Sequence, residues 1–107
     1  MKPFQIGVAV IGLGICLSGS ALLAEETIDA AALYKKHCAM CHKADGKGYP
    51  AMKTPDFTDK EWQDNHTDEE FSEAVTNGKG TMPKFEAKLK PEEIKTIIAE
   101  VVRKFVQ

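Results

Sequence analysis

The chain has 107 residues, which is enough for one domain. Its 14 basic and 16 acidic residues give a formal net charge of −2, and from residue 25 onward 13 basic and 16 acidic residues give −3. This acidic balance argues against nucleic acid as a partner.

The N-terminal segment has the pattern of an export signal. Residues 4–24 carry no charge and follow Lys2, as in a secretory signal peptide. Cleavage is expected after Ala21 or Ala24, although the uncharged run is also long enough to cross a bilayer as an uncleaved anchor. We therefore expect residues 1–24 to be a signal peptide or membrane anchor. Residues 25–107 are expected to form one exported domain, in the periplasm or otherwise outside the cytoplasm.

A helix is expected to begin at residues 27–29 and to run past residue 38. Ala30 and Tyr34 recur at helical spacing with Cys38 and Cys41, so these four side chains share one face. The Asp-Gly-Lys-Gly sequence of residues 45–48 is expected to end the helix and turn the chain.

Residues 38–42 read Cys-Ala-Met-Cys-His, which is the attachment sequence of c-type haem. Cys38 and Cys41 lie one helical turn apart, so both sulfurs can form thioethers to one porphyrin, and His42 can ligate its iron. A thioredoxin-like pair requires a βαβ context, and no strand pattern lies nearby. A structural zinc site requires a second ligand pair, which no other spacing in the chain provides. One covalent haem c is therefore predicted, and it adds core to a small domain.

Two aromatic residues are candidates for contact with this haem. Tyr34 lies one turn before Cys38 and is expected to pack against the porphyrin edge. Trp62 follows residues 58–61, Thr-Asp-Lys-Glu, which have the form of a capping box that begins a short helix. Its indole N–H is expected either to reach a haem propionate or simply to lie in the core.

The remaining elements follow in order. Residues 49–50 and 54–57 are expected to be extended. A second capping box at residues 67–70 predicts a helix of about ten residues that stops at Asn77-Gly78. The last helix is expected to begin at Pro91, because apolar residues then recur at helical spacing: Ile94, Ile97, Ile98, Val101, Val102 and Phe105.

The second axial position of the iron decides between electron transfer and ligand chemistry. Met82 lies in the Gly- and Pro-rich loop of residues 78–83, 40 residues after His42, so the intervening chain can wrap the haem and return on its other face. Three alternatives stay open. Met52 is close to the attachment sequence, His66 precedes a capping box and is expected to be a solvated turn residue, and the position could be vacant.

With these motifs the chain resembles the class I c-type cytochromes, in particular the small mono-haem bacterial and photosynthetic type. The resemblance rests on residues 33–42, 45–48 and 77–85 and on the last helix, and Val101 stands where the family often has an aromatic residue. It implies an all-α fold of three to four helices wrapped around one haem, with the first and last helices crossing near it. It also implies that His42 and Met82 are the axial ligands, and that a dedicated export-side system attaches the haem.

The function expected from these features is that of an exported electron carrier, not an enzyme, cycling between Fe(II) and Fe(III) and passing electrons between a redox donor and acceptor. One alternative is a haem enzyme or gas sensor, which needs an open or labile sixth position. The other is an electron-transfer subunit of a larger membrane oxidoreductase, which an uncleaved anchor would permit.

Charge is segregated along the chain. Residues 35–53 hold five lysines and one acid, residues 79–90 hold four lysines and one acid, and residues 56–73 hold eight acids and one lysine. We expect the lysines to surround the haem edge of a monomer and to meet an acidic face of the redox partner. The alternative is that these are simply solvated side chains.

Overall fold

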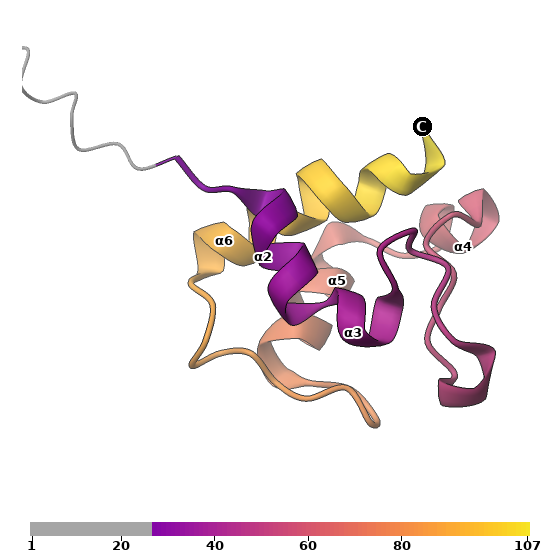
Figure 1. Ribbon diagram of the computed structural model, residues 1–107, viewed down its shortest axis with the longest axis horizontal. Helices are drawn as coiled ribbons and strands as arrows, with labels where there is room; N and C mark the ends of the chain where they lie inside the picture. The colour runs from indigo at the N-terminus through magenta and orange to yellow at the C-terminus, as the bar shows by residue number, and fades with distance from the viewer. Residues whose placement is uncertain (1–26) are drawn as a thin grey trace, which may run out of the picture.

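The computed structural model describes residues 27–107, and the segment 1–24 assigned above to export lies outside them. The described chain is helical and contains no β-strand (Figure 1). Its helical elements are α2 (Ala30–His37), α3 (Ala39–His42), the 3-10 turn η2 (Pro50–Met52), α4 (Lys60–Asp64), α5 (Asp68–Asn77), α6 (Pro91–Ile97), the π turn η3 (Ile98–Val102) and the 3-10 turn η4 (Arg103–Val106). The all-α prediction is confirmed.

The first predicted helix is broken at Cys38. Asp29 caps α2 by accepting a hydrogen bond from the Ala32 N–H at 3.0 Å. At Cys38 the backbone leaves regular helix geometry, with φ −113° and ψ −36°. A new turn, α3, then begins, in which the Cys38 carbonyl accepts from His42 at 2.9 Å. The prediction of one continuous helix was wrong because the apolar spacing continues across a break in the backbone.

The middle of the chain differs from expectation at two points. Residues 49–50 were expected to begin an extended stretch, but residues 50–52 form the 3-10 turn η2, which Pro50 begins and Lys53 ends in the left-handed region at φ 59°. Helix α4 is capped by Asp59 and not by Thr58, because the Asp59 carboxylate accepts from the N–H groups of the first turn at 3.0 and 3.2 Å. The Thr58 hydroxyl instead donates to Asp56 at 2.6 Å.

Helices α5 and α6 begin where the sequence predicts. The Thr67 hydroxyl accepts from the Glu70 N–H at 3.1 Å, and the Glu70 carboxylate accepts from the Thr67 N–H at 2.7 Å. Helix α5 ends at Asn77, with Gly78 as its C-cap. Pro91 opens α6, and Glu93 accepts from the backbone N–H that precedes the helix at 2.8 Å.

The core lies where the N-terminal and C-terminal helices meet. Helix α2 packs against α6 and η3, and α5 packs against the same C-terminal segment (Figure 1). Ala30 is buried at this contact, and Val101 is half-buried against the core. The helix pairing is therefore kept with valine in place of the aromatic residue. Among residues 27–107, no helix has the length and apolar character needed to cross a membrane.

Candidate haem site

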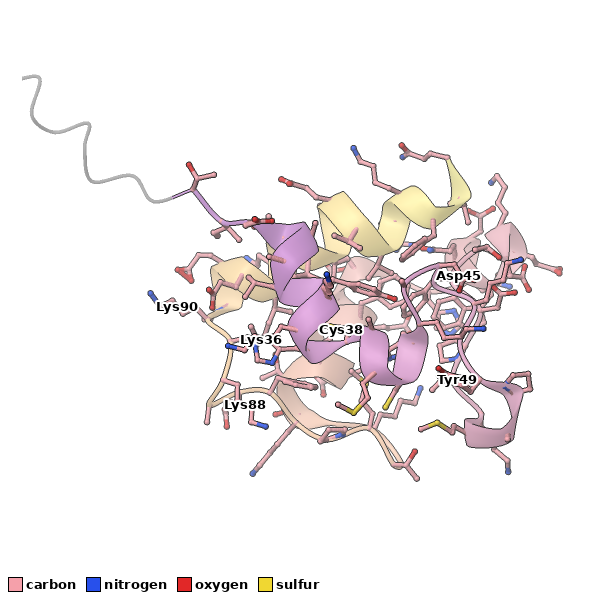
Figure 2. All side chains as sticks on the ribbon, viewed as in Figure 1. Lys36, Cys38, Asp45, Tyr49, Lys88 and Lys90 are labelled. Carbon is pink, nitrogen blue, oxygen red and sulfur yellow. The ribbon has the colours of Figure 1, made fainter. Side chains whose placement is uncertain are left out.

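Cys38 lies at the junction of α2 and α3 (Figure 2), and Cys41 lies within α3. Cys38 and Cys41 are both half-buried and both free thiols. Burial raises the pKa of Cys38 to about 11. A thiol with a raised pKa is protonated at neutral pH.

His42 is the buried histidine of this region, with 9% of its surface exposed. Burial lowers its pKa, so its imidazole is neutral at pH 7. Its Nδ1 is buried and has no hydrogen-bond partner among the described residues. Neutral imidazole is the form that ligates a metal, and a buried polar atom without a partner requires an explanation. The combination of this imidazole with two thiols on one short turn fits covalent haem and its iron.

A ring that the sequence analysis did not single out covers His42. Phe57 stacks on the imidazole with ring centroids 4.7 Å apart and planes 17° from parallel. Its N–H donates to the Gly46 carbonyl at 2.7 Å. Gly46 has φ +77°, and a Cβ there would lie 2.7 Å from the Phe105 ring. The turn after the attachment sequence therefore depends on a glycine to bring Phe57 onto His42.

Met82 ends a tight turn, where it pairs with Lys79 in an isolated antiparallel bridge. The N–H of Lys79 donates to the Met82 carbonyl at 3.1 Å, and the Met82 N–H donates back at 2.9 Å. Gly78 has φ +83°, and a Cβ at that position would lie 2.8 Å from the Met82 carbonyl oxygen. The Met82 side chain is half-buried against the core. The two backbone hydrogen bonds with Lys79 and the close approach of Gly78 therefore fix the backbone of Met82.

The two alternative iron ligands lie in different surroundings. Met52 is 46% exposed. His66 is half-buried and not solvated as expected, because its ring stacks on Trp62 at 4.3 Å. Its Nδ1 is 2.7 Å from the Trp62 carbonyl oxygen. That ring nitrogen is therefore already engaged within its own turn.

Tyr34 and Trp62 both pack in the core. The Tyr34 hydroxyl donates to the Lys43 carbonyl at 2.7 Å, and burial raises the pKa of this phenol. Tyr34 thus fixes the backbone directly after His42. The Trp62 ring is half-buried between Phe57 and Phe71, at centroid distances of 5.7 and 5.5 Å.

The lysines of residues 35–53 and 79–90 are free of ion pairs. In the described chain the ion pairs are Lys60–Asp64 and Arg103–Asp68, so none of these nine lysines is paired. Figure 2 shows Lys36, Lys88 and Lys90 on the same side of the molecule. Unpaired lysines on one side leave their charge available to a partner.

The chain is similar to several known cytochromes. The family profile for cytochrome c oxidase, cbb3-type, subunit III matches residues 25–99. Cytochrome c6 of Nostoc sp. (strain PCC 7120 / SAG 25.82 / UTEX 2576) is 33% identical over 103 residues, covering 96% of this chain and 93% of that protein. The cbb3-type oxidase subunit FixP of Bradyrhizobium sp. (strain ORS 278) is 34% identical over 94% of this chain, which spans only 35% of FixP. The solved KustC0563 c-type cytochrome has a TM-score of 0.70 and 37% identity, covering 75% of this chain and all of that one.

Proposed function

This chain belongs to the class I c-type cytochromes, mono-haem proteins that carry electrons, and on that premise we propose how its own residues hold the haem. Membership of the family implies one covalently bound haem c with its iron. The bound haem supplies reversible one-electron chemistry. The residues of the chain attach the haem, ligate its iron and exclude water.

Cys38 and Cys41 would attach the haem through two thioethers, and His42 would ligate its iron. The observation that carries this assignment is the neutral, buried imidazole on the same short turn as two free thiols. Met82 would be the second protein ligand of the iron. Its support is the half-buried side chain on a constrained turn, in contrast to exposed Met52 and to His66, whose ring is stacked on Trp62. A methionine ligand and apolar surroundings both raise the reduction potential.

With both axial positions filled by side chains, the protein is an electron carrier and not an enzyme or gas sensor. Carbon monoxide added to the ferrous native protein tests this, because it binds only where the sixth position is open or labile. We expect no change in the Soret band of the native protein or of Met52→Ala, and carbon monoxide binding in Met82→Ala. Rapid binding to the native protein would favour the sensor or enzyme alternative.

The attachment itself has a separate test. Extraction with acid and organic solvent should leave the colour with the polypeptide, because thioethers survive this treatment. Colour in the organic layer would contradict the assignment of Cys38 and Cys41.

A second candidate function is that of an electron-transfer subunit in a larger oxidoreductase. The match to FixP over 94% of this chain favours it. The size of the native complex after gentle membrane solubilisation distinguishes the two candidates, since a free carrier runs as a monomer.

The same preparation also tests whether the chain is exported with its N-terminal segment removed or retained. The mass of the intact polypeptide shows whether residues 1–24 have been removed as a signal peptide or remain as a membrane anchor.

The unpaired lysines dock the haem edge on an acidic redox partner. Long-range attraction of this kind raises the association rate and weakens with salt. Exchanging Lys47 and Lys84 for Glu should slow electron transfer at low ionic strength while the reduction potential stays nearly constant. An unchanged rate and salt dependence would mean that these lysines are merely solvated.

A further inference from the structure

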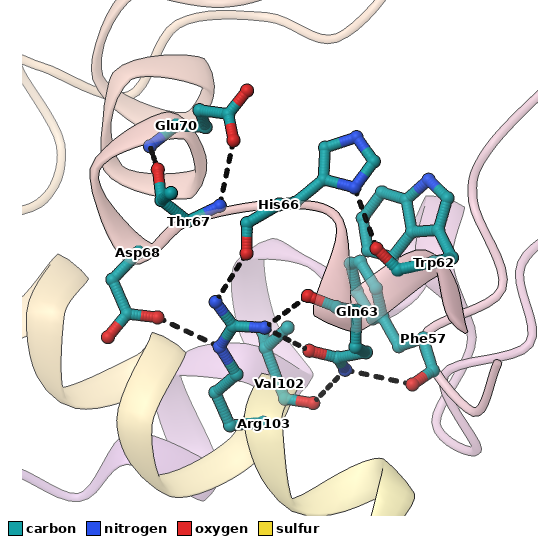
Figure 3. Close-up of polar contacts among 9 residues, drawn as sticks. All are labelled: Phe57, Trp62, Gln63, His66, Thr67, Asp68, Glu70, Val102 and Arg103. Atoms are coloured by element: carbon teal, nitrogen blue, oxygen red, sulfur yellow. Dashed lines mark hydrogen bonds and ion pairs between the residues drawn. The ribbon is translucent and has the colours of Figure 1, made fainter. Parts of the chain in front are cut away.

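Gln63 is a fully buried polar side chain at the centre of the contact between α4 and the C-terminal segment, with 1% of its surface exposed. Its Nε2 donates two hydrogen bonds, to the Phe57 carbonyl at 2.8 Å and to the Val102 carbonyl at 2.7 Å (Figure 3). One amide therefore joins the loop before α4 to the π turn of the last helix. Without it, two carbonyl groups would lose their shared donor inside the core.

Arg103 fixes the orientation of this amide. Its Nη1 donates to the Oε1 and to the backbone carbonyl of Gln63 at 2.9 and 2.8 Å. Its Nη2 donates to the His66 carbonyl at 2.7 Å and its Nε to Asp68 at 2.8 Å (Figure 3). A guanidinium can only donate and a carbonyl can only accept, so these partners permit one of the two amide orientations. Gln63 is held as a donor toward Phe57.

Phe57 connects this network to the candidate iron ligand. Its carbonyl receives the Gln63 hydrogen bond, while its ring stacks on His42 at 4.7 Å. Its other aromatic neighbours, Trp62 and Phe105, lie farther away, at 5.7 and 6.1 Å between centroids. The residue that touches His42 is thus held by a buried hydrogen bond that comes from 21 positions beyond His42 in the sequence.

We propose that Gln63 is a positioning residue for His42: by holding the Phe57 backbone it keeps the Phe57 ring against the imidazole. This proposal rests on the proposed function, in which His42 ligates the iron. Residues that orient a metal-bound histidine and exclude water from it tune the metal's properties. Gln63 therefore acts on the reduction potential through Phe57, in addition to joining α4 to the last helix.

The test compares Gln63→Met with the native holoprotein. Methionine keeps the length and volume of the side chain but donates no hydrogen bond. We expect a lower reduction potential, because the loosened Phe57 ring admits water beside His42. We also expect changed haem methyl resonances in the proton NMR spectrum of the ferric protein, which report the orientation of the imidazole plane. Glu93→Ala is the matched control, since it removes the capping box of α6 and lowers the thermal midpoint without touching Gln63, Phe57 or the partners of Arg103.

A double-mutant cycle with Phe57→Leu tests the route. If Gln63 acts through Phe57, the shifts in potential caused by the two substitutions will not add, and the double variant will resemble Phe57→Leu alone. If Gln63→Met does not accumulate as holoprotein, Phe57→Leu by itself must change both the potential and the NMR pattern.

Three results would overturn the inference: additive shifts, an unchanged NMR pattern in Gln63→Met or Phe57→Leu, or an equal shift in Glu93→Ala. A native protein whose haem lacks a histidine ligand would instead overturn the proposed function, so the two failures are distinguishable.

Discussion

The surroundings of His42 and of Met82 are held in place by different means. Around His42 the bonds join distant parts of the chain, as when Gln63 binds the Val102 carbonyl and Arg103 binds Gln63. Around Met82 the backbone bonds stay local, between Lys79 and Met82 and between Phe85 and Val75. A segment held by local bonds can open by itself, whereas a segment held by long-range bonds opens only with the elements it joins. The methionine side should therefore be the labile side of the site.

Removing the haem attachment should abolish this difference, because neither region is expected to persist without the cofactor. In Cys38→Ala combined with Cys41→Ala, mature holoprotein should fall sharply, and the far-ultraviolet circular dichroism of the apoprotein should show little stable helix. The physical reason is that a domain of this size has a marginal core of its own. A cooperative thermal transition in the haem-free chain would contradict this expectation.

Substitution of Met82 should disrupt the methionine side of the haem site and leave the histidine side intact. In Met82→Ala the weak near-infrared band of methionine-ligated ferric haem should vanish while the Soret band persists. The reduction potential should fall by roughly a few tenths of a volt, within the span that axial ligands control. Met52→Ala is the control and should leave the band and the potential unchanged. Loss of the band in Met52→Ala would identify the other methionine as the ligand.

Substitution of two glycines near Met82 should have a smaller effect and should test how the backbone holds the methionine side. Gly78 and Gly80 both have positive φ, at 83° and 60°, but only a Cβ on Gly78 would collide with the Met82 backbone. Gly78→Ala should weaken methionine ligation and lower stability by about 1–3 kcal/mol, and Gly80→Ala should cost less. A denaturant titration followed by the near-infrared band measures the effect of each substitution as a change in the midpoint at which the band is lost. Equal effects would mean that the close approach at Gly78 does not hold Met82.

The smallest expected effect concerns pH and the cap of α5. The hydrogen bond from the Thr67 backbone N–H lowers the pKa of Glu70 below its usual value. The unfolded chain therefore takes up this proton first as pH falls, so the stabilisation is complete above the ordinary carboxyl pKa and is lost as pH passes through the lower folded value. Thermal midpoints measured from pH 6 to pH 3 should fall less in Glu70→Gln than in the native protein. Parallel curves would remove Glu70 from the acid response.

The sequence predicted those parts of the molecule that depend on local patterns. The attachment sequence, the Thr67 capping box, the stop at Gly78 and the start of α6 at Pro91 each depend on a few neighbouring residues. The break at Cys38 and the cap at Asp59 were missed, because helical spacing and a four-residue pattern do not specify the backbone conformation at one position.

The surroundings of His42 could not have been read from the sequence in the same way. Phe57 lies on His42 only because residues 43–57 fold back through Gly46, and Gln63 finds its partners 39 and 40 positions later in Val102 and Arg103. A glutamine that follows Trp62 and precedes Asp64 on a short helix carries no sign of burial. Contacts of this kind follow from tertiary packing and not from a local pattern.

The position of Arg103 also sets an order in which the fold can close. Arg103 follows His42 by 61 residues, so the turn at the attachment sequence can form from nearby residues, whereas Gln63 is locked toward Phe57 only after the C-terminal segment has packed against α4. Until then no side chain from the last helix holds the Phe57 ring against the imidazole. We therefore expect haem to reach Cys38 and Cys41 before this segment packs, and the C-terminal segment to close the histidine side afterwards.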